Sequence, residues 1–394
     1  MKEGWEIKQW KDVLEIRSGR SQKQVEDPNG KYPILGSSGK VMGYTDSYIC
    51  EEGTTIVGRK GSINNPMMIE SKFWNVDTAF GLHALNELDN KYLYYFCLGF
   101  DFTKMDRGSG RPSLVKSDLL KISIPIPPLS EQKAIVRILD QAFAAIEQAQ
   151  ANIQRNIENA EELFQSKLEE IFSQREEGWE ERRISDLVSD AVLSKPMDGN
   201  HGNIHPKKSD FKESGVPFIM ASHLVNGEVN QATCNFISEK QAATLKKGFA
   251  KDGDVLLSHK GTIGRVAILY TNLDYVVLTP QVTYYRILKK DQIFNKYLYY
   301  YFRSPIFQSP MIQIAGIGST RAYIGITKQQ ELIIRFPTNL ENQKEIAFDL
   351  DALNIHSSLL IKKYKLKLEF LDDLKKSLLQ KAFAGELTEK EIPA

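Results

Sequence analysis

The feature that most constrains the fold of this 394-residue chain is an internal duplication. Four segments occur twice in the same order: EGWEIKQW (3–10) with EGWEERRI (177–184), VGRKGSI (57–63) with LSHKGTIG (257–264), KYLYYF (91–96) with KYLYYYF (296–302), and LSEQKAIVRILD (129–140) with LENQKEIAFDLD (340–351). A sequence written twice predicts one structural unit formed twice. We therefore expect two similar copies of a single domain.

The spacing between equivalent residues grows along the chain and then becomes constant. It is 174, 200, 211 and 211 residues for the pairs Gly4/Gly178, Gly61/Gly261, Gln132/Gln343 and Phe172/Phe383. Insertions therefore accumulated in the globular part of the second copy. The end of each copy matches without a gap.

These ungapped stretches have the pattern of long helices. In 131–172, apolar residues recur at steps of three and four with no proline or glycine, which is typical of a helix with one apolar face. The second copy repeats this stripe, interrupted at Ser357 and Lys375. Forty residues of helix form a rod of about 60 Å. Because the apolar side of such a rod must be buried, we expect the two helices to pack as an antiparallel coiled coil.

The rest of each copy predicts a small, mostly-β domain. Segments such as 54–63 and 254–270 are rich in β-branched and aromatic residues and are punctuated by glycine. Each KYLYYF segment predicts a helix whose rings form a buried face of the domain core; the alternative is a surface for stacking nucleic-acid bases.

We predict an α+β fold with a pseudo-two-fold internal duplication. Two mostly-β recognition domains are separated by two long helices packed as an antiparallel coiled coil. The boundaries are 1–129 for the first domain, 130–174 for the first helix, 175–340 for the second domain, and 341–394 for the second helix with a C-terminal tail.

Composition favours a soluble chain in a reducing compartment. No stretch reaches the roughly 18 apolar residues of a membrane span, and the first residues lack the apolar run of a signal peptide. We expect a cytoplasmic protein with no membrane partner. Cys50, Cys97 and Cys234 are few and far apart, which fits buried thiols better than disulfides or a zinc site.

No complete catalytic motif is found in the sequence. NNPMM at 64–68 lacks the second proline and the aromatic residue that an adenine-N6 methyltransferase needs, and no Walker A sequence occurs. His201 and His205 lie near Asp198, but the surrounding glycine and proline predict a surface loop rather than a metal site. We expect no catalytic residue, metal or cofactor in this chain.

Basic loops are better represented than catalytic motifs. Four segments combine arginine or lysine with glycine, serine and threonine: GRKGS (58–62), DRGSGRPS (106–113), SHKGTIGR (258–265) and GIGSTR (316–321). Such loops can approach a phosphate backbone closely and aim a guanidinium at guanine. Each alone would be interpreted as a solvated turn, but their recurrence in both copies makes binding an equal alternative. The net charge of +1 does not by itself demand nucleic acid.

Together these features resemble the DNA specificity subunit of a type I restriction–modification system. The resemblance rests on the duplicated layout, IPIPPLSEQKAI (124–135) at the start of the first long helix, the GRKGSI and HKGTIG loops, and LLQKAFAGELT (378–388). It covers essentially the whole chain. The second junction, RFPTNLENQKEI (335–346), has fewer prolines than the first, which predicts less rigidity there.

The resemblance implies that two target recognition domains each read one half of a bipartite sequence in double-stranded DNA. Two helices would space these domains and dock two modification subunits. It also implies that the S-adenosylmethionine-dependent adenine-N6 methyltransferase lies in those partners. The ATP- and Mg²⁺-dependent endonuclease would lie in restriction subunits.

Under this hypothesis, the polar and basic loop residues contact DNA phosphates or bases: Arg59, Lys60, Ser62, Arg107, Arg111, Lys260, Thr262, Arg265, Thr320 and Arg321. Second choices come from the matching loops ILGSSG (34–39) and IMASHL (219–224): Ser37, Ser38, Ser222 and His223. Two other classes remain open. One is a non-catalytic coiled-coil scaffold that binds proteins; it would show no affinity for DNA, even with methyltransferase partners present. The other is a self-sufficient DNA-modifying enzyme, for which the motifs are missing.

Overall fold

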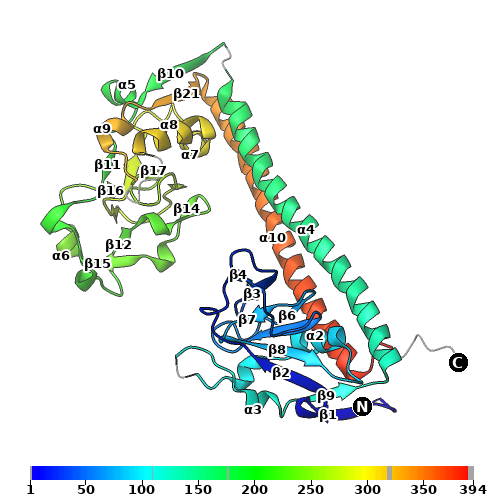
Figure 1. Cartoon of the computed structure of the whole chain (residues 1–394). Coiled ribbons are helices and arrows are strands. Elements are labelled where there is room, and N and C mark those ends of the chain that lie inside the picture. The colour runs from blue at the N-terminus through cyan, green and yellow to red at the C-terminus, as the bar shows by residue number, and fades with distance from the viewer. Residues whose placement is uncertain (1, 109, 175–176, 317–321, 389–394) are drawn as a thin grey trace. The chain divides into compact units, whose positions relative to one another are not determined.

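The computed structural model describes residues 2–108, 110–174, 177–316 and 322–388 (Figure 1). The chain divides into two compact units, which are Met1–Arg155 with Tyr364–Ala394 (unit 1) and Asn156–Lys363 (unit 2). Both units include part of α4 (Leu129–Ser173) and part of α10 (Leu340–Ala384). The two long helices predicted from the apolar stripes are thus confirmed.

Unit 1 is built on small, mostly antiparallel sheets. Its four-stranded sheet has the order β2-β8-β5-β6, its three-stranded sheet has the order β4-β3-β7, and β1 pairs with β9. Within the three-stranded sheet, β3 and β7 are parallel. The strands are β1 (Glu6–Gln9), β2 (Leu14–Ser18), β3 (Tyr32–Leu35), β4 (Val41–Thr45), β5 (Thr54–Gly58), β6 (Met67–Ile69), β7 (Trp74–Asn75), β8 (Ala79–Ala84) and β9 (Ser123–Ile126). The helices besides α4 and α10 are α1 (Trp10–Val13), α2 (Asn90–Gly99), the 3-10 helix η1 (Phe102–Met105) and α3 (Lys116–Leu119).

Unit 2 repeats this topology with additions. The order β11-β20-β17-β18 corresponds to β2-β8-β5-β6, and β15-β12-β19 corresponds to β4-β3-β7, including its parallel pair. The strands are β10 (Trp179–Arg183), β11 (Met197–Asp198), β12 (Val216–Ile219), β13 (Leu224–Val225), β14 (Glu228–Val229), β15 (Asn235–Ile237), β16 (Phe249–Ala250), β17 (Val255–Ser258), β18 (Val266–Ile268), β19 (Val276–Leu278), β20 (Val282–Tyr285) and β21 (Ile333–Pro337). The short helices are α5 (Ile184–Ser189), α6 (Glu239–Ala242), α7 (Asn295–Arg303), α8 (Pro305–Ala315) and α9 (Ile326–Gln329). The 3-10 helices are η2 (Gly202–Ile204), η3 (Lys208–Asp210), η4 (Ala221–His223) and η5 (Gln231–Thr233). The extra strands β13, β14 and β16 lie within the stretch where the spacing grows.

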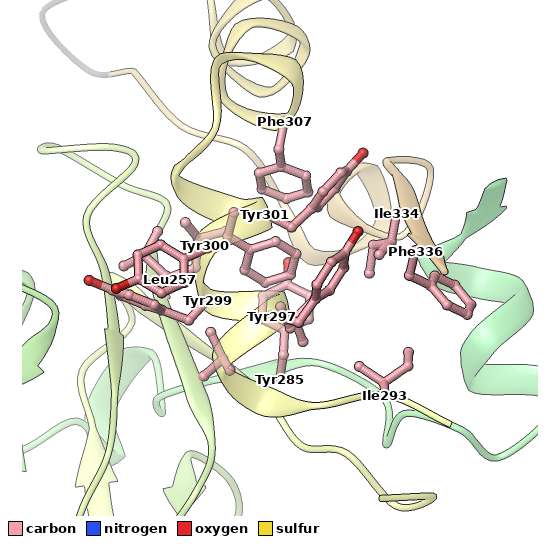
Figure 2. Close-up of a cluster of buried hydrophobic side chains, with 14 of the residues drawn as sticks. Leu257, Tyr285, Ile293, Tyr297, Tyr299, Tyr300, Tyr301, Phe307, Ile334 and Phe336 are labelled. Atoms are coloured by element: carbon pink, nitrogen blue, oxygen red, sulfur yellow. The ribbon is translucent and has the colours of Figure 1, made fainter. Parts of the chain in front are cut away.

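The repeated aromatic segments form helices α2 and α7, and most of their rings are buried. In α7, every residue from Tyr297 to Phe302 is buried, and Figure 2 shows these rings gathered with Ile334 and Phe336. In α2, Tyr92, Tyr95 and Phe96 are likewise buried. The prediction of a core face is confirmed, because rings enclosed in a core leave no free face for a base.

The long helices pair with each other inside each unit, in opposite directions. In unit 1, the Gln150 side chain donates to Asp372 at 2.8 Å, and Lys375 lies 3.8 Å from the Glu147 carboxylate. In unit 2, one apolar cluster joins the α4 residues Phe164, Leu168 and Phe172 to the α10 residues Ala347 and Leu350. Residue numbers rise along one helix as they fall along the other, so the pairing is antiparallel, as predicted.

A buried glutamine joins each domain to its helix in the same way. In unit 1, the amide oxygen of Gln132 accepts from the Asp89 N–H at 2.8 Å, while its amide nitrogen donates to the carbonyls of Glu87 and Pro127 at 2.7 and 2.9 Å. In unit 2, Gln343 accepts from the Phe294 N–H at 3.0 Å and donates to two carbonyls, those of Gln292 and Pro337, each at 2.8 Å.

A carboxylate on each long helix also holds the aromatic helix. Asp140 accepts from the Tyr95 hydroxyl at 2.6 Å and pairs with Lys91 at 2.8 Å. Asp351 accepts from the Tyr300 hydroxyl at 2.6 Å and pairs with Lys296. The duplication is therefore reproduced in individual hydrogen bonds where domain and helix meet.

All three cysteines are free and buried, as the sequence predicted. Burial raises the pKa of the Cys50 thiol to about 12, which keeps it protonated. Among the described residues, no helix combines the length and low polarity needed to cross a bilayer.

Candidate nucleic-acid interface

In unit 1, two of the basic loops are joined by backbone hydrogen bonds. The Gly61 N–H donates to the Pro112 carbonyl at 2.9 Å, the Leu114 N–H donates to the Arg59 carbonyl at 2.9 Å, and Lys60 forms an isolated β-bridge with Ser113. The loop after β5 therefore lies against the segment before α3. Residues about fifty positions apart in sequence, 59–61 and 112–114, lie side by side. We call this pair of joined segments the edge of unit 1.

Unit 2 contains the same arrangement. The Gly261 N–H donates to the Ala322 carbonyl at 3.2 Å, and the Ile324 N–H donates to the His259 carbonyl at 3.1 Å. Lys260 forms an isolated β-bridge with Tyr323. The loops after β5 and after β17 thus each lie against a second segment, at equivalent places in the two copies.

Glycine is required at the turn of the first edge. Gly61 has a φ of +83°, a conformation that side chains disfavour, and a Cβ there would lie 2.9 Å from the Arg111 guanidinium. Gly261 takes a similar φ of +76°. Both loops can therefore turn sharply at these glycines.

The predicted contact residues of unit 1 mostly face solvent. Lys60, Ser62 and Arg111 are exposed. The Arg59 guanidinium lies over the Phe80 ring, 5.6 Å from its centre. Arg107 is exposed and its Nε pairs with the Asp118 carboxylate at 2.8 Å, which fixes the direction of the guanidinium.

The predicted residues of unit 2 are placed similarly where they are described. Lys260, Thr262 and Arg265 are exposed. The Arg265 backbone N–H donates to the Ser258 hydroxyl at 2.9 Å, and its guanidinium donates to the Ala221 carbonyl at 3.3 Å. Thr320 and Arg321 lie outside the described residues.

The second-choice loops adjoin these edges. In unit 1, Ser37 and Ser38 line an open cavity of about 460 Å³ together with Thr78. The Thr78 carbonyl accepts from the Arg59 N–H at 2.7 Å. In unit 2, Ser222 is exposed beside Ala221. His223 is only 7% exposed, and its Nδ1 accepts from the Met220 N–H at 3.1 Å, so its side chain holds the turn instead of facing solvent.

Sequence reasoning did not single out two lysines near Arg107. Lys104 and Lys121 line an open cavity of about 430 Å³ together with Arg107 and Asp118. Lys121 also pairs with Asp118 at 3.2 Å. Both lysines are isolated in sequence, and only the fold places them beside the loop, so no motif could have indicated them.

The histidine-rich segment forms a polar cluster in unit 2. The His201 Nε2 lies 2.7 Å from the Asp198 carboxylate, which also pairs with Lys247. Burial raises the pKa of Asp198, but the hydrogen bonds from Lys247 and His201 outweigh it and hold the pKa below its usual value. The described residues contain no group of three or more histidine, cysteine or acidic side chains arranged to hold a metal ion.

The duplicated domain, the paired helices and the repeated edges agree with a comparison against known families. The family described as "Type I restriction modification DNA specificity domain" matches residues 2–159 and 176–369. The chain belongs to this family.

Relatives of known class match almost the full length. The specificity subunit of the type I restriction enzyme MjaVIII from Methanocaldococcus jannaschii is 25% identical, with 99% of this chain and 94% of that protein covered. The EcoBI specificity subunit from Escherichia coli is 21% identical, with 95% of this chain and 85% of that protein covered.

Two solved structures share the fold. A chain from a structure on complex assembly and conformational transition of a type I restriction–modification system superposes with a TM-score of 0.79 at 19% identity, covering 98% of this chain and 99% of that chain. The HsdS subunit from Thermoanaerobacter tengcongensis superposes with a TM-score of 0.58 at 19% identity, covering 98% of both chains.

Proposed function

We propose that this chain is the DNA specificity subunit of a type I restriction–modification complex, and that each unit reads one half of a bipartite target in double-stranded DNA. The observation that carries the proposal is the repeated edge. In both units a basic, glycine-containing loop is held by backbone hydrogen bonds against a second segment. Its exposed side chains supply the donors that contact phosphates and base edges.

The chemistry of the complex is assigned to partner subunits. Adenine methylation with S-adenosylmethionine would lie in two modification subunits, and ATP- and Mg²⁺-dependent translocation and cleavage would lie in restriction subunits. The role of this chain is to bind DNA and to position those partners. The family and the absence of a complete catalytic motif in the sequence both support this division.

Exposed apolar side chains on α10 support protein docking by the long helices. In unit 1, Leu366, Phe370 and Leu374 are exposed, and Phe370 is 62% exposed. In unit 2, Phe348, Ile355, Leu359 and Leu360 are also exposed. In each unit these residues recur mainly at steps of four and seven along the helix and so lie near one face, and a contiguous exposed apolar face commonly marks a protein interface.

A matched pair of substitutions tests this docking. Phe370→Asp should weaken co-purification of the modification subunits by about tenfold or more, because a charge would be buried at the interface. The equivalent position on α4 is Asn159, so Asn159→Asp controls for added charge. Equal assembly of both variants would contradict docking at this part of α10.

DNA binding is tested by methylome sequencing of cells that express the chain with its modification subunits, followed by binding of the assembled complex to duplexes. A bipartite methylated motif is expected. Arg59→Ala and Lys260→Ala should each weaken binding by about threefold to tenfold, and loss of a phosphate contact should also reduce the salt dependence. A complex with no sequence preference in DNA would overturn the proposed function. Unchanged affinity of Arg59→Ala at low salt would remove that residue from the interface.

The role of the helices as spacers is tested by shortening both together. Removing one heptad from each, at 151–157 and 363–369, keeps the antiparallel register and shortens a helix by about 10 Å, which corresponds to roughly three base-pair steps of DNA. The methylated motif should lose about three unread base pairs while both half-sites stay the same. An unaltered gap between the half-sites would refute a spacing role.

A further inference from the structure

Unit 2 presents an exposed tyrosine directly beside a predicted DNA-contacting lysine. Tyr323 is 45% exposed, and the Lys260 ammonium lies 5.9 Å from the centre of its ring. The two residues face each other across the isolated β-bridge of this edge. An aromatic ring next to a cation suits a nucleic-acid surface, because the ring can pack on a sugar or base while the ammonium meets a phosphate.

A buried histidine lies behind this pair. His259 is 0% exposed, and its ring lies 5.6 Å from the Tyr323 ring at an angle of 47°. Its Nδ1 donates to the Ile324 carbonyl at 2.9 Å, and its own carbonyl accepts from the Ile324 N–H at 3.1 Å. His259 therefore bonds to both polar groups of the residue that follows Tyr323, and the Ile324 carbonyl also accepts from the Gln329 amide at 2.9 Å.

The other ring nitrogen shows that packing alone does not explain this histidine. Among the described residues, the His259 Nε2 has no hydrogen-bond partner, and it lies 3.9 Å from a carboxylate oxygen of Asp198. An unpaired buried nitrogen lowers stability, whereas an apolar ring would fill the same space without that cost. The hydrogen bond that this ring makes among the described residues is the one from Nδ1 to the Ile324 carbonyl.

The equivalent residue in unit 1 makes no such contact. Arg59 offers its carbonyl to Leu114, as His259 does to Ile324, but its side chain turns to Phe80. The segment is held there by Asp106 instead, whose carboxylate accepts from the Gly108 and Ser113 N–H groups, each at 2.8 Å. Of the two equivalent residues, only His259 of unit 2 therefore holds the facing segment with its side chain.

We infer that His259 is a positioning residue, which holds Lys260 and Tyr323 as one DNA-contacting edge of unit 2. The inference rests on the proposed function and adds two residues to it. His259 acts through the Ile324 carbonyl, and Tyr323 touches the DNA.

The test uses the chain assembled with its modification subunits and duplexes in which the bases of one half-site at a time are changed. For each half-site, the affinity ratio of cognate to changed duplex measures discrimination. His259→Phe should lower discrimination by about tenfold at the half-site read by unit 2, as expected for one lost hydrogen bond, and leave the other half-site unchanged. His259→Asn, whose amide can replace the Nδ1–H donor, should stay within about threefold of the wild type. Tyr323→Ala should reproduce the effect of His259→Phe without touching the core.

Each alternative result has a definite meaning. Wild-type discrimination in a folded His259→Phe complex would overturn the inference, and so would an equal loss at both half-sites, which indicates general destabilisation. If His259→Asn behaves like His259→Phe, the Nδ1 donor is not the cause and the inference is also overturned. If His259→Phe does not fold, Tyr323→Ala decides, and unchanged discrimination in that variant overturns the inference. Failure of the wild type to discriminate at either half-site would instead count against the proposed function.

Discussion

The two units are alike where a domain meets the long helices and differ at the edges formed by the basic loops. Gln132 and Gln343 each make three hydrogen bonds to the same kinds of backbone groups. At the edge, Arg59 of unit 1 is replaced by a buried histidine in unit 2, and the two residues make different side-chain contacts. A duplicated reader of two different sequences needs this division, because both copies use the same helices but must differ in what they recognise.

The sheets show a second difference beneath a shared topology. In unit 2, Arg286 donates twice to the buried Asp254 carboxylate, at 2.9 and 2.8 Å. At the equivalent strand positions of unit 1, the Thr54 hydroxyl pairs with the His83 Nδ1 at 3.0 Å. At the same place in the sheet, unit 2 therefore has a charged, bidentate pair and unit 1 has a neutral hydrogen bond.

The largest expected effect concerns the shared joint. Gln132→Leu and Gln343→Leu should each destabilise their own unit by at least about 3 kcal/mol, because each leaves one N–H and two carbonyl groups without their partner, at about 1–3 kcal/mol per buried group. Hydrogen exchange of α2 and α7 amides, with denaturant unfolding of the whole chain, measures the two effects separately. The exposed Gln148→Leu on α4 serves as the control. If one of the two substitutions leaves the stability of its unit unchanged, the two glutamines do not have the same role.

The next effect concerns the exchanged sheet pair. Asp254→Asn should destabilise unit 2 by about 3 kcal/mol, because it leaves a largely enclosed guanidinium without its counter-charge. Thr54→Val should cost unit 1 only about 1 kcal/mol, the value of one neutral hydrogen bond. Denaturant midpoints of the two variants test the order. Equal losses would mean that the two pairs are equivalent in energy despite their chemistry.

Most of the fold could be predicted from the sequence, because its main signals are periodic or repeated. The apolar stripe of α4 and the constant spacing from Gln132 to Phe172 indicate long paired helices directly. The buried rings of α2 and α7 follow from a repeated aromatic segment. These features depend on local pattern, which sequence shows well.

The edges were only partly predictable, because they form between distant segments. Lys60 and Lys260 could be proposed from basic, glycine-containing loops, whose role in DNA binding stays a prediction. Tyr323 and Lys121 carry no motif, and their place beside those loops depends on which segments the sheets bring together. His223 belongs to a loop of the right composition, but a local hydrogen bond turns its side chain inward.

The smallest expected effect concerns stability at acid pH. The two units should differ in it because they contain different buried histidines. Burial lowers the pKa of His223 and His259 in unit 2, whereas in unit 1 His83 has a lowered pKa, by burial and by the nearby Arg17. These rings are neutral in the folded state, and in the unfolded chain they take up a proton near pH 6.5. The free energy of unfolding is therefore at its full value above about pH 6.5. It decreases as the pH falls below that value, by at most about 1.4 kcal/mol per pH unit for each ring.

Unit 2 should consequently lose more stability than unit 1 between pH 7.5 and 5.5, as measured by hydrogen exchange of the two units. His259→Asn should remove its share of this loss, because asparagine cannot take up the proton, while the exposed His356→Asn should change nothing. If both units weaken equally on acidification, or if His259→Asn leaves the pH dependence intact, another group controls the acid response. The difference between the units would then lie in their recognition edges and not in their response to protons.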